Sequence, residues 1–223
     1  MFDRVQAKTA ARELMRRNLG AAVGADMLSI LGSLVPFAAP PAQLGLSSFY
    51  LSYADQKRAK ASAVFGGFNN ALKAVGLFFW RWLWMALWIG VPAFIITLIA
   101  VLVAGSGIVR MFNPYYAMMS SATASFTIAK ILLILAALWI ILGSIYKRVQ
   151  YSFAFFVLAA HPELSVAECL RRSRVMTGDC FWQVLIMRLS FIGWAILSAI
   201  TSGLVSLFWA APYFNFAYAV AYR

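Results

Sequence analysis

The sequence has few charged residues, and acidic residues are the scarcest of them. Only 12% of the 223 residues are charged, and Asp and Glu together number 7 against 19 Lys and Arg. Soluble domains have about twice that charged fraction, so the chain has too few polar residues to cover the surface of a soluble globule. With 63% hydrophobic residues, it cannot be a disordered chain either. The sequence therefore indicates an integral membrane protein.

Cysteine and histidine are nearly absent. Cys169 and Cys180 are the only cysteines and His161 is the only histidine, so the sequence holds no ligand set with the spacing of a metal site. Both cysteines fall in a segment that we place in the reducing cytoplasm, which argues against a disulfide. We expect no metal and no cofactor.

Long apolar runs are the main feature that is present. A bilayer core about 30 Å thick requires roughly 20 apolar residues in a helix, and such runs predict an all-α fold, a polytopic six-helix transmembrane bundle forming one domain over 1–223. Pro92 should kink the third span, and Gly143 is the candidate break in the fourth. The predicted spans cover 19–37, 42–55, 74–104, 124–146 with an apolar extension to 160, 181–200 and 204–222.

Two further segments are amphipathic. An N-terminal arm precedes the first span, and basic residues at every fourth position give it one basic stripe. A short helix over 165–177 begins with a capping box formed by Ser165 and Glu168, and Gly178 should be its C′ residue. We predict that this helix lies on the cytoplasmic surface.

Positive charge falls on one side of this arrangement. Fifteen of the 19 Lys and Arg lie in segments that face the cytoplasm when both termini are inside, as the positive-inside rule requires. The same alternation makes 42–55 cross the membrane, although its length would also suit a re-entrant segment. Basic charge at the ends of apolar runs indicates membrane orientation and not nucleic-acid binding. The fifteen are Arg4, Lys8, Arg12, Arg16, Arg17, Lys57, Arg58, Lys60, Lys73, Lys147, Arg148, Arg171, Arg172, Arg174 and Arg223.

Three of the charged side chains inside apolar spans lie at a similar depth. Asp26, Arg81 and Arg188 each lie about seven or eight residues from the cytoplasmic end of a span, roughly 10–12 Å deep, so they could meet. A charge inside the membrane costs about 2.5–3.5 kcal/mol and needs a partner or water. Three interpretations stay open: a neighbour caps Asp26 while both arginines reach back to the inner surface, Asp26 pairs with one arginine, or the three line a path for a ligand or an ion.

Basic residues near the inner surface are candidate contacts for anionic lipids. An anionic leaflet attracts such residues at about 1 kcal/mol per charge. A solvated basic face that only sets the topology is the alternative. The candidates are Arg4, Lys8, Arg12, Arg16, Lys147 and Arg148.

The region of the capped helix carries a recognisable pattern. Residues 161–178 contain Ser-x-x-Glu-x-Leu and then Ser-x-x-Met-x-Gly, and further matching stretches lie at 11–14, 65–68 and 189–194. The chain resembles the bacterial integral-membrane family called domain of unknown function 975, with Leu142-Gly143 where that family usually has Pro-Gly. The resemblance implies a six-span fold, distantly similar to the membrane domain of some glycerophosphodiester phosphodiesterases. It implies no activity and no catalytic residues.

The residues themselves do not indicate an enzyme. The sequence lacks the zinc-protease, nucleophile-elbow and Walker motifs, and the Ser-x-x-Lys spacing of Ser144 and Lys147 arises often by chance. We expect a non-enzymatic protein of the bacterial inner membrane that handles a lipid or small amphiphile or assists transport. Its expected partners are membrane lipids, especially anionic ones of the inner leaflet. A structural or partner subunit without a ligand, including a homo-oligomer, is the alternative.

The topology can be tested by chemical labelling. Cysteine introduced at Ser106 or Ser120 should react with an impermeant thiol reagent only from outside, and cysteine at Ser173 only from inside, because the basic residues hold both termini in the cytoplasm. Reaction is measured on intact cells and inverted vesicles, with the chain lacking the new cysteine as control. Labelling at Ser173 from outside would contradict the topology.

Overall fold

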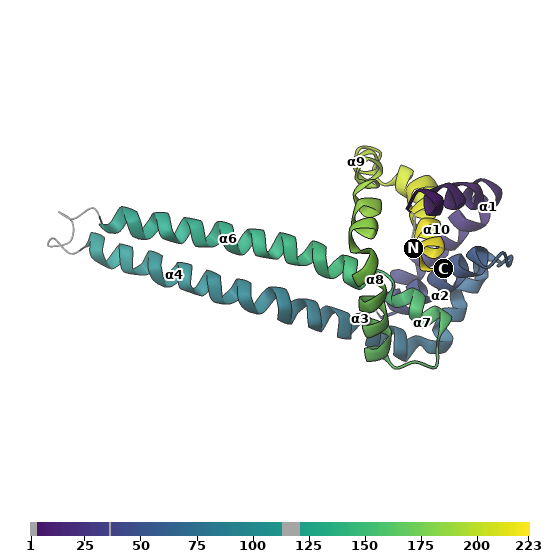
Figure 1. Ribbon diagram of the computed structural model, residues 1–223, viewed down its shortest axis with the longest axis horizontal. Coiled ribbons are helices and arrows are strands. Elements are labelled where there is room, and N and C mark those ends of the chain that lie inside the picture. The colour runs from purple at the N-terminus through teal and green to yellow at the C-terminus, as the bar shows by residue number, and fades with distance from the viewer. Residues whose placement is uncertain (1–3, 36, 113–120) are drawn as a thin grey trace. The chain divides into compact units, whose positions relative to one another are not determined.

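The computed structural model describes residues 4–35, 37–112 and 121–223. All regular secondary structure in these ranges is helical, which confirms the predicted all-α class (Figure 1). The elements are α1 (Arg4–Ser33), α2 (Ala39–Ala54), the 3₁₀ helix η1 (Ala61–Asn70), α3 (Ala71–Met85), the π-helix η2 (Ala86–Gly90), α4 (Val91–Met111), α6 (Ser121–Gln150), α7 (Ala154–Ala160), α8 (Val166–Leu189), α9 (Ile192–Ile200), the π-helix η3 (Ser206–Ala210) and α10 (Ala211–Tyr222).

The elements form two compact units. Unit 1 comprises residues 1–81 and 149–223, and unit 2 comprises residues 82–148. The sequence predicts one integral-membrane domain over 1–223, and the packing resolves two units within that range.

Three helical stretches are long and apolar enough to cross a membrane: Ala61–Val109, Ala124–Ala160 and Val166–Ile200. They contain the predicted spans 74–104, 124–146 and 181–200. The other three predicted spans lie in α1, in α2 and in η3 with α10. At 16 residues, α2 is about 24 Å long, shorter than the hydrocarbon core.

In unit 2, α4 and α6 run alongside each other (Figure 1). Small residues spaced by seven are buried on both helices, Ala93 and Ala100 on α4 and Ala129 and Ala136 on α6. Alanine and glycine let two helices approach closely inside a membrane. The large side chains, such as Phe94, point outward, and its exposed fraction is 68%. Unit 2 is therefore an apolar pair of helices with small residues inside.

The structure has no break at Gly143, the candidate position for one. Helix α6 continues through this position to Gln150, and a helix interruption follows only at 151–153. A Cβ at Gly143 would lie 3.3 Å from Cγ1 of Ile89. Gly143 therefore permits close packing within unit 2 and does not end the helix.

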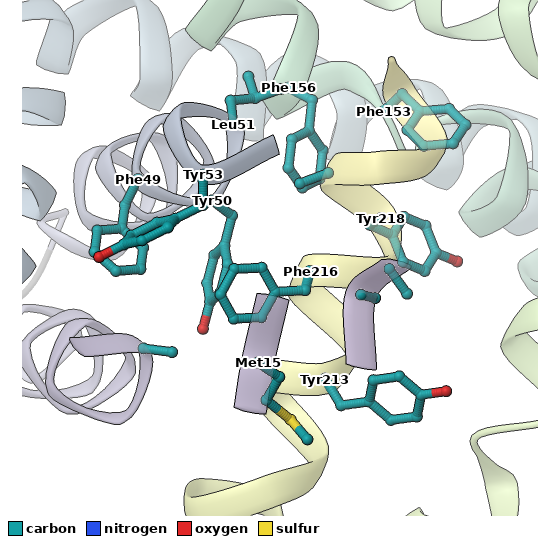
Figure 2. Close-up of a cluster of buried hydrophobic side chains, with 14 of the residues drawn as sticks. Met15, Phe49, Tyr50, Leu51, Tyr53, Phe153, Phe156, Tyr213, Phe216 and Tyr218 are labelled. Carbon is teal, nitrogen blue, oxygen red and sulfur yellow. The ribbon is translucent and has the colours of Figure 1, made fainter. Parts of the chain in front are cut away.

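The core of unit 1 is an aromatic cluster between α2, α7 and α10. Tyr50 meets Phe216 edge-on with ring centroids 4.8 Å apart, and Phe49 and Tyr53 pack beside them at 5.0 Å from each other. Figure 2 shows these rings around α10. Edge-on aromatic pairs contribute about 0.5–1.5 kcal/mol beyond the area they bury. The cluster holds α2 against α10.

Helix α2 and the 3₁₀ helix η1 approach each other through glycine. A Cβ at Gly67 would lie only 2.1 Å from the backbone oxygen of Pro41, and a Cβ at Gly45 only 1.7 Å from that of Val64. No side chain fits at these two positions, because the obstructing atoms belong to the backbone. The Phe-Gly-Gly-Phe stretch at 65–68 is therefore a packing motif.

Two helices bend where a predicted surface segment meets a predicted span. Asn18 in α1 (φ −133°, ψ 24°) and Cys180 in α8 (φ −125°, ψ 23°) leave the helical conformation. Each side chain donates to a carbonyl four residues earlier, Asn18 Nδ2 to Leu14 at 3.0 Å and Cys180 Sγ to Met176 at 3.1 Å. The spans predicted to begin at residues 19 and 181 start directly after these bends.

The capping box prediction is confirmed at its first residue, and the predicted helix end is wrong. Ser165 is the N-cap and its Oγ accepts from the Glu168 N–H at 3.3 Å. The helix passes Gly178, which has no positive φ, and continues to Leu189 with the bend at Cys180. The apolar sequence after Asp179 extends the helix beyond the glycine.

Two prolines follow π-helical turns. The π-helix η2 ends two residues before Pro92, and η3 ends two residues before Pro212. Proline removes one backbone donor and crowds the preceding turn, and a wider π turn accommodates both effects. The kink expected at Pro92 stays a prediction, and the structure has a π turn just before this proline.

The structure also changes the choice of labelling position for the topology test. Ser173 is fully buried, and its hydroxyl donates to the Gln150 carbonyl at 2.9 Å. Its neighbour Arg172 is exposed and serves as the inner position instead. Ser120, one of the outer positions, lies outside the described residues.

Replacing Gly67 by alanine should destabilise the protein strongly. Gly67→Ala forces a methyl group onto the Pro41 carbonyl, so overpacking should cost at least about 3 kcal/mol. The adjacent Gly66→Ala is a matched control, because its methyl group would meet no atom within 4 Å other than its own chain neighbours. Thermal unfolding in detergent would measure both. Equal melting temperatures for the two variants would contradict the close approach of α2 and η1.

Candidate functional site

Asp26 is buried in unit 1, where it joins three helices. Its exposed fraction is 4%. Its carboxylate accepts a hydrogen bond from the Tyr50 hydroxyl of α2 at 2.9 Å and one from Asn215 Nδ2 of α10 at 3.2 Å. Small buried residues on the same helix, Ala22 and Ala25, let α1 come close enough for these bonds. A buried carboxylate needs such donors.

The two hydrogen-bond donors of Asp26 are therefore neutral, whereas the sequence offered an arginine as one possible partner. Among the described residues, none of the ion pairs involves Asp26. The Arg81 guanidinium lies 5.4 Å from the centre of the Phe155 ring. Of the three interpretations, the described residues favour capping of Asp26 by its neighbours Tyr50 and Asn215. Tyr50 and Asn215 carry no charge, so a search for charged residues misses them.

Arg188 instead lines a groove on unit 1 that also reaches Asn215. The groove has a volume of about 450 Å³ and runs between α8 and α9 on one side and η3 and α10 on the other. Its wall is mainly apolar and includes Phe191, Trp194 and Phe214. Ligand pockets commonly enclose roughly 300–1,000 Å³. Asn215 thus connects Asp26 with the groove.

Several buried polar side-chain atoms of α8, α9 and α10 have no hydrogen-bond partner among the described residues. In the described part of the chain these atoms are Gln183 Oε1, Ser198 Oγ, Tyr213 Oη and Tyr218 Oη, all on α8, α9 or α10. Ser198 lines the groove itself. Buried polar atoms are normally paired, and those that are not call for a bound molecule or water. The described residues therefore supply no hydrogen-bond partner for these four atoms.

Part of the N-terminal basic stripe lies beside the groove. Lys8 Nζ donates to Ser190 Oγ at 3.0 Å and lies 5.5 Å from the centre of the Phe191 ring. The Arg12 guanidinium lies 5.9 Å from the centre of the Tyr213 ring. The stripe is therefore folded against α9 and α10 at these two positions.

The other candidate lipid contacts lie elsewhere. Arg16 lines a separate surface pocket with Arg12 and Arg17, and Arg148 is exposed. Lys147 Nζ lies 4.7 Å from the centre of the Trp88 ring within unit 2. The side chain of Arg4 lies outside the described part of the structure.

The described residues do not form a metal site of the kind that a metalloenzyme uses. Within them no group of three His, Cys, Asp or Glu could hold a metal ion, and Cys169 and Cys180 are both free thiols. The absence of enzyme activity stays a prediction.

The sequence pattern suggests membership of a protein family, and comparison with known families tests it. The family described as "Protein of unknown function (DUF975)" matches residues 1–223. The chain belongs to this family. No curated protein and no solved structure matches it. Membership of DUF975 covers the whole chain and brings no substrate or partner, so the functional argument rests on the residues.

The hydrogen bonds of Asp26 can be tested by a double-mutant cycle. Tyr50→Phe should lower the free energy of unfolding by about 1–3 kcal/mol, because the buried carboxylate loses one of two donors. In the double variant Tyr50→Phe/Asp26→Ala, the loss of unfolding free energy should be smaller than the sum of the two single losses. In Arg81→Gln/Asp26→Ala, the two losses should simply add. Denaturant unfolding in detergent would measure these values.

Tyr213→Phe is the control for this cycle. Its hydroxyl is buried without a partner, so removing the oxygen should leave stability unchanged or raise it. The assigned hydrogen bonds of Asp26 would be contradicted by either of two results. One is a loss of unfolding free energy in Tyr50→Phe no larger than in Tyr213→Phe, and the other is energetic coupling between Asp26 and Arg81.

Proposed function

We propose that this DUF975 protein binds a lipid or small amphiphile in the unit 1 groove and does not change it chemically. The observation that carries the proposal is the groove of about 450 Å³ with an apolar wall, a guanidinium at Arg188 and the amide of Asn215. A mostly apolar pocket with few convergent polar groups is the usual form of a small-molecule site. Amphiphiles combine the same two chemical characters.

The proposed setting is the bacterial inner membrane, with six spans and both termini in the cytoplasm. Three helical stretches have the length and apolarity of spans. The segments rich in basic residues also lie together: Arg223 pairs with Asp55 beside Lys57, and one pocket joins Arg17 of α1 with Arg58. Residues that lie together in the fold belong on one side of a membrane, which supports the alternation derived from charge.

Assistance to a transport system is one use for such a site. The competing function is that of a partner subunit without a ligand. Unit 2 favours this alternative, because α4 and α6 expose large apolar side chains such as Leu102 and Leu142 along their lengths. Acyl chains of the bilayer would cover such side chains equally well, so the presence or absence of a ligand separates the two functions.

Retention of an amphiphile by the purified protein tests the proposal. Native mass spectrometry of the full chain in mild detergent should show bound molecules of lipid mass, and exhaustive delipidation should lower the melting temperature until lipid is returned, because binding to the folded state stabilises it. A protein without bound lipid, whose melting temperature does not respond to added lipid, would contradict the proposal and favour the partner subunit.

A matched pair of variants connects retention to the groove. Ala195 lines the groove, so Ala195→Trp should fill part of it and reduce lipid retention several-fold. Ala199 is an exposed residue of the same helix α9 and is not among the lining residues, so Ala199→Trp should retain lipid as the parent does. Equal retention by the two variants would place any bound lipid elsewhere.

A further inference from the structure

We propose that the ligand of the groove is an anionic glycerophospholipid whose phosphate lies at Arg188 and Lys8 and whose acyl chain lies along Phe191, Trp194 and Phe214. This inference rests on the proposed function and specifies the ligand class. The two ends of the groove differ in chemistry, and that difference gives the bound lipid a direction.

One end of the groove is polar and cationic. Arg188 lines it together with Asn215, and the two belong to facing helices, α8 and α10. Lys8 reaches the same end from α1, because its Nζ donates to Ser190 Oγ, two residues beyond Arg188. Arg12 lies against Tyr213, two residues before Asn215. Arg188 therefore lines this end, Lys8 lies beside it against Phe191, and Arg12 lies further off in a separate surface pocket.

These cations lack acidic partners in the described part of the chain. The ion pairs there use Arg17, Arg171, Arg172, Arg223 and His161, and none uses Lys8, Arg12 or Arg188. Asp26 lies behind Asn215 and is occupied by Tyr50 and Asn215. The end of the groove therefore carries positive charge that these residues do not balance, and an anion of the ligand would balance it.

Two neutral tyrosine hydroxyls lie near this end of the groove, although neither residue lines it. Tyr213 and Tyr218 lie on either side of Asn215 in α10, their exposed fractions are 3% and 2%, and neither hydroxyl has a partner. Figure 2 shows both hydroxyls pointing to the same side of α10, away from the contact of Tyr50 with Phe216. The Tyr218 ring packs on Phe214, a wall residue of the groove, at 4.4 Å. Both hydroxyls are covered, so they mark a polar region behind the groove wall and are not themselves ligand contacts.

The rest of the groove suits one acyl chain. From Arg188 to Ser198 the wall runs along α8 and α9 for ten residues, about 15 Å at helical rise. That length is half of the roughly 30 Å hydrocarbon core, the depth of one leaflet. Small residues such as Ala195, Ser198 and Ser206 leave the far half open near the turn at 201–203. The apolar wall and the positive charge at Arg188 together match an anionic lipid with an acyl chain.

Trp194 provides a direct measurement, because it lines the groove. The full chain in nonionic detergent would be titrated with brominated phosphatidylglycerol or brominated phosphatidylcholine, whose bromine quenches tryptophan fluorescence on contact. The chain has 8 tryptophans, so the part of the quenching that Trp194→Phe removes is the signal from the groove. We expect this part to saturate at a lower mole fraction of phosphatidylglycerol than of phosphatidylcholine.

Charge variants locate the phosphate. Arg188→Gln and Lys8→Gln should each weaken phosphatidylglycerol binding at the Trp194 site about fivefold, since each basic residue contributes about that factor toward an anionic lipid. The effect on phosphatidylcholine should be smaller, because its choline group offsets the charge of the same phosphate. Arg188→Lys keeps the charge and should keep the preference. Arg58→Gln removes an exposed charge that does not line this groove and should have no effect.

Each outcome decides the inference, and failure of the proposed function gives a different pattern. Equal binding of the two lipids, or an unchanged preference in Arg188→Gln, overturns the anionic ligand while amphiphile binding stands. If Arg188→Lys loses the preference for phosphatidylglycerol as Arg188→Gln does, the site recognises the shape of the side chain and not its charge. That result also overturns the anionic ligand. A Trp194 signal without saturation by either lipid removes the groove as a binding site and fails the proposed function itself.

Discussion

The buried carboxylate of Asp26 is the constraint on which the arrangement of unit 1 depends. A carboxylate excluded from water requires donors, and Asp26 takes them from Tyr50 of α2 and Asn215 of α10. The consecutive helices α1 and α2 are thereby held in register with α10 from the far end of the chain. The Tyr50 ring in turn packs on Phe216, so the aromatic core and the polar contact support each other. Asn215 also lines the groove, which couples the register of the helices to the shape of the candidate site.

Helix irregularities occur beside the groove and at the bends of α1 and α8. The π turn η3 before Pro212 supplies Ser206 and Ala210 to the groove, and the bends at Asn18 and Cys180 are each accompanied by a side-chain bond to a carbonyl four residues earlier. In hydrocarbon an unpaired backbone group costs several kcal/mol, so a helix can bend only where such replacements exist. These positions therefore combine a change of direction with satisfied polar groups.

The basic residues serve two different purposes in this fold. Arg17, Arg171 and Arg223 pair with nearby carboxylates at exposed positions, where ion pairs contribute little to stability. Lys8, Arg12 and Arg188 instead lie against aromatic rings or in the groove. A count of charges along the chain treats both groups alike. Their separation depends on which helix each side chain meets.

Sequence alone determined the helical class, the apolar stretches, the cap at Ser165 and the family, because apolar runs, capping and motif spacing are local properties. It also marked Asp26 and Arg188 as unusual, since charge inside an apolar run is visible without a fold. Only the tertiary structure decided that Asp26 meets Tyr50 and Asn215, that α6 passes Gly143 and α8 passes Gly178, and that Arg188 opens into a groove. These outcomes depend on contacts between distant segments. A neutral tyrosine or asparagine has no distinctive signal until the helix that needs its hydrogen bond is placed beside it.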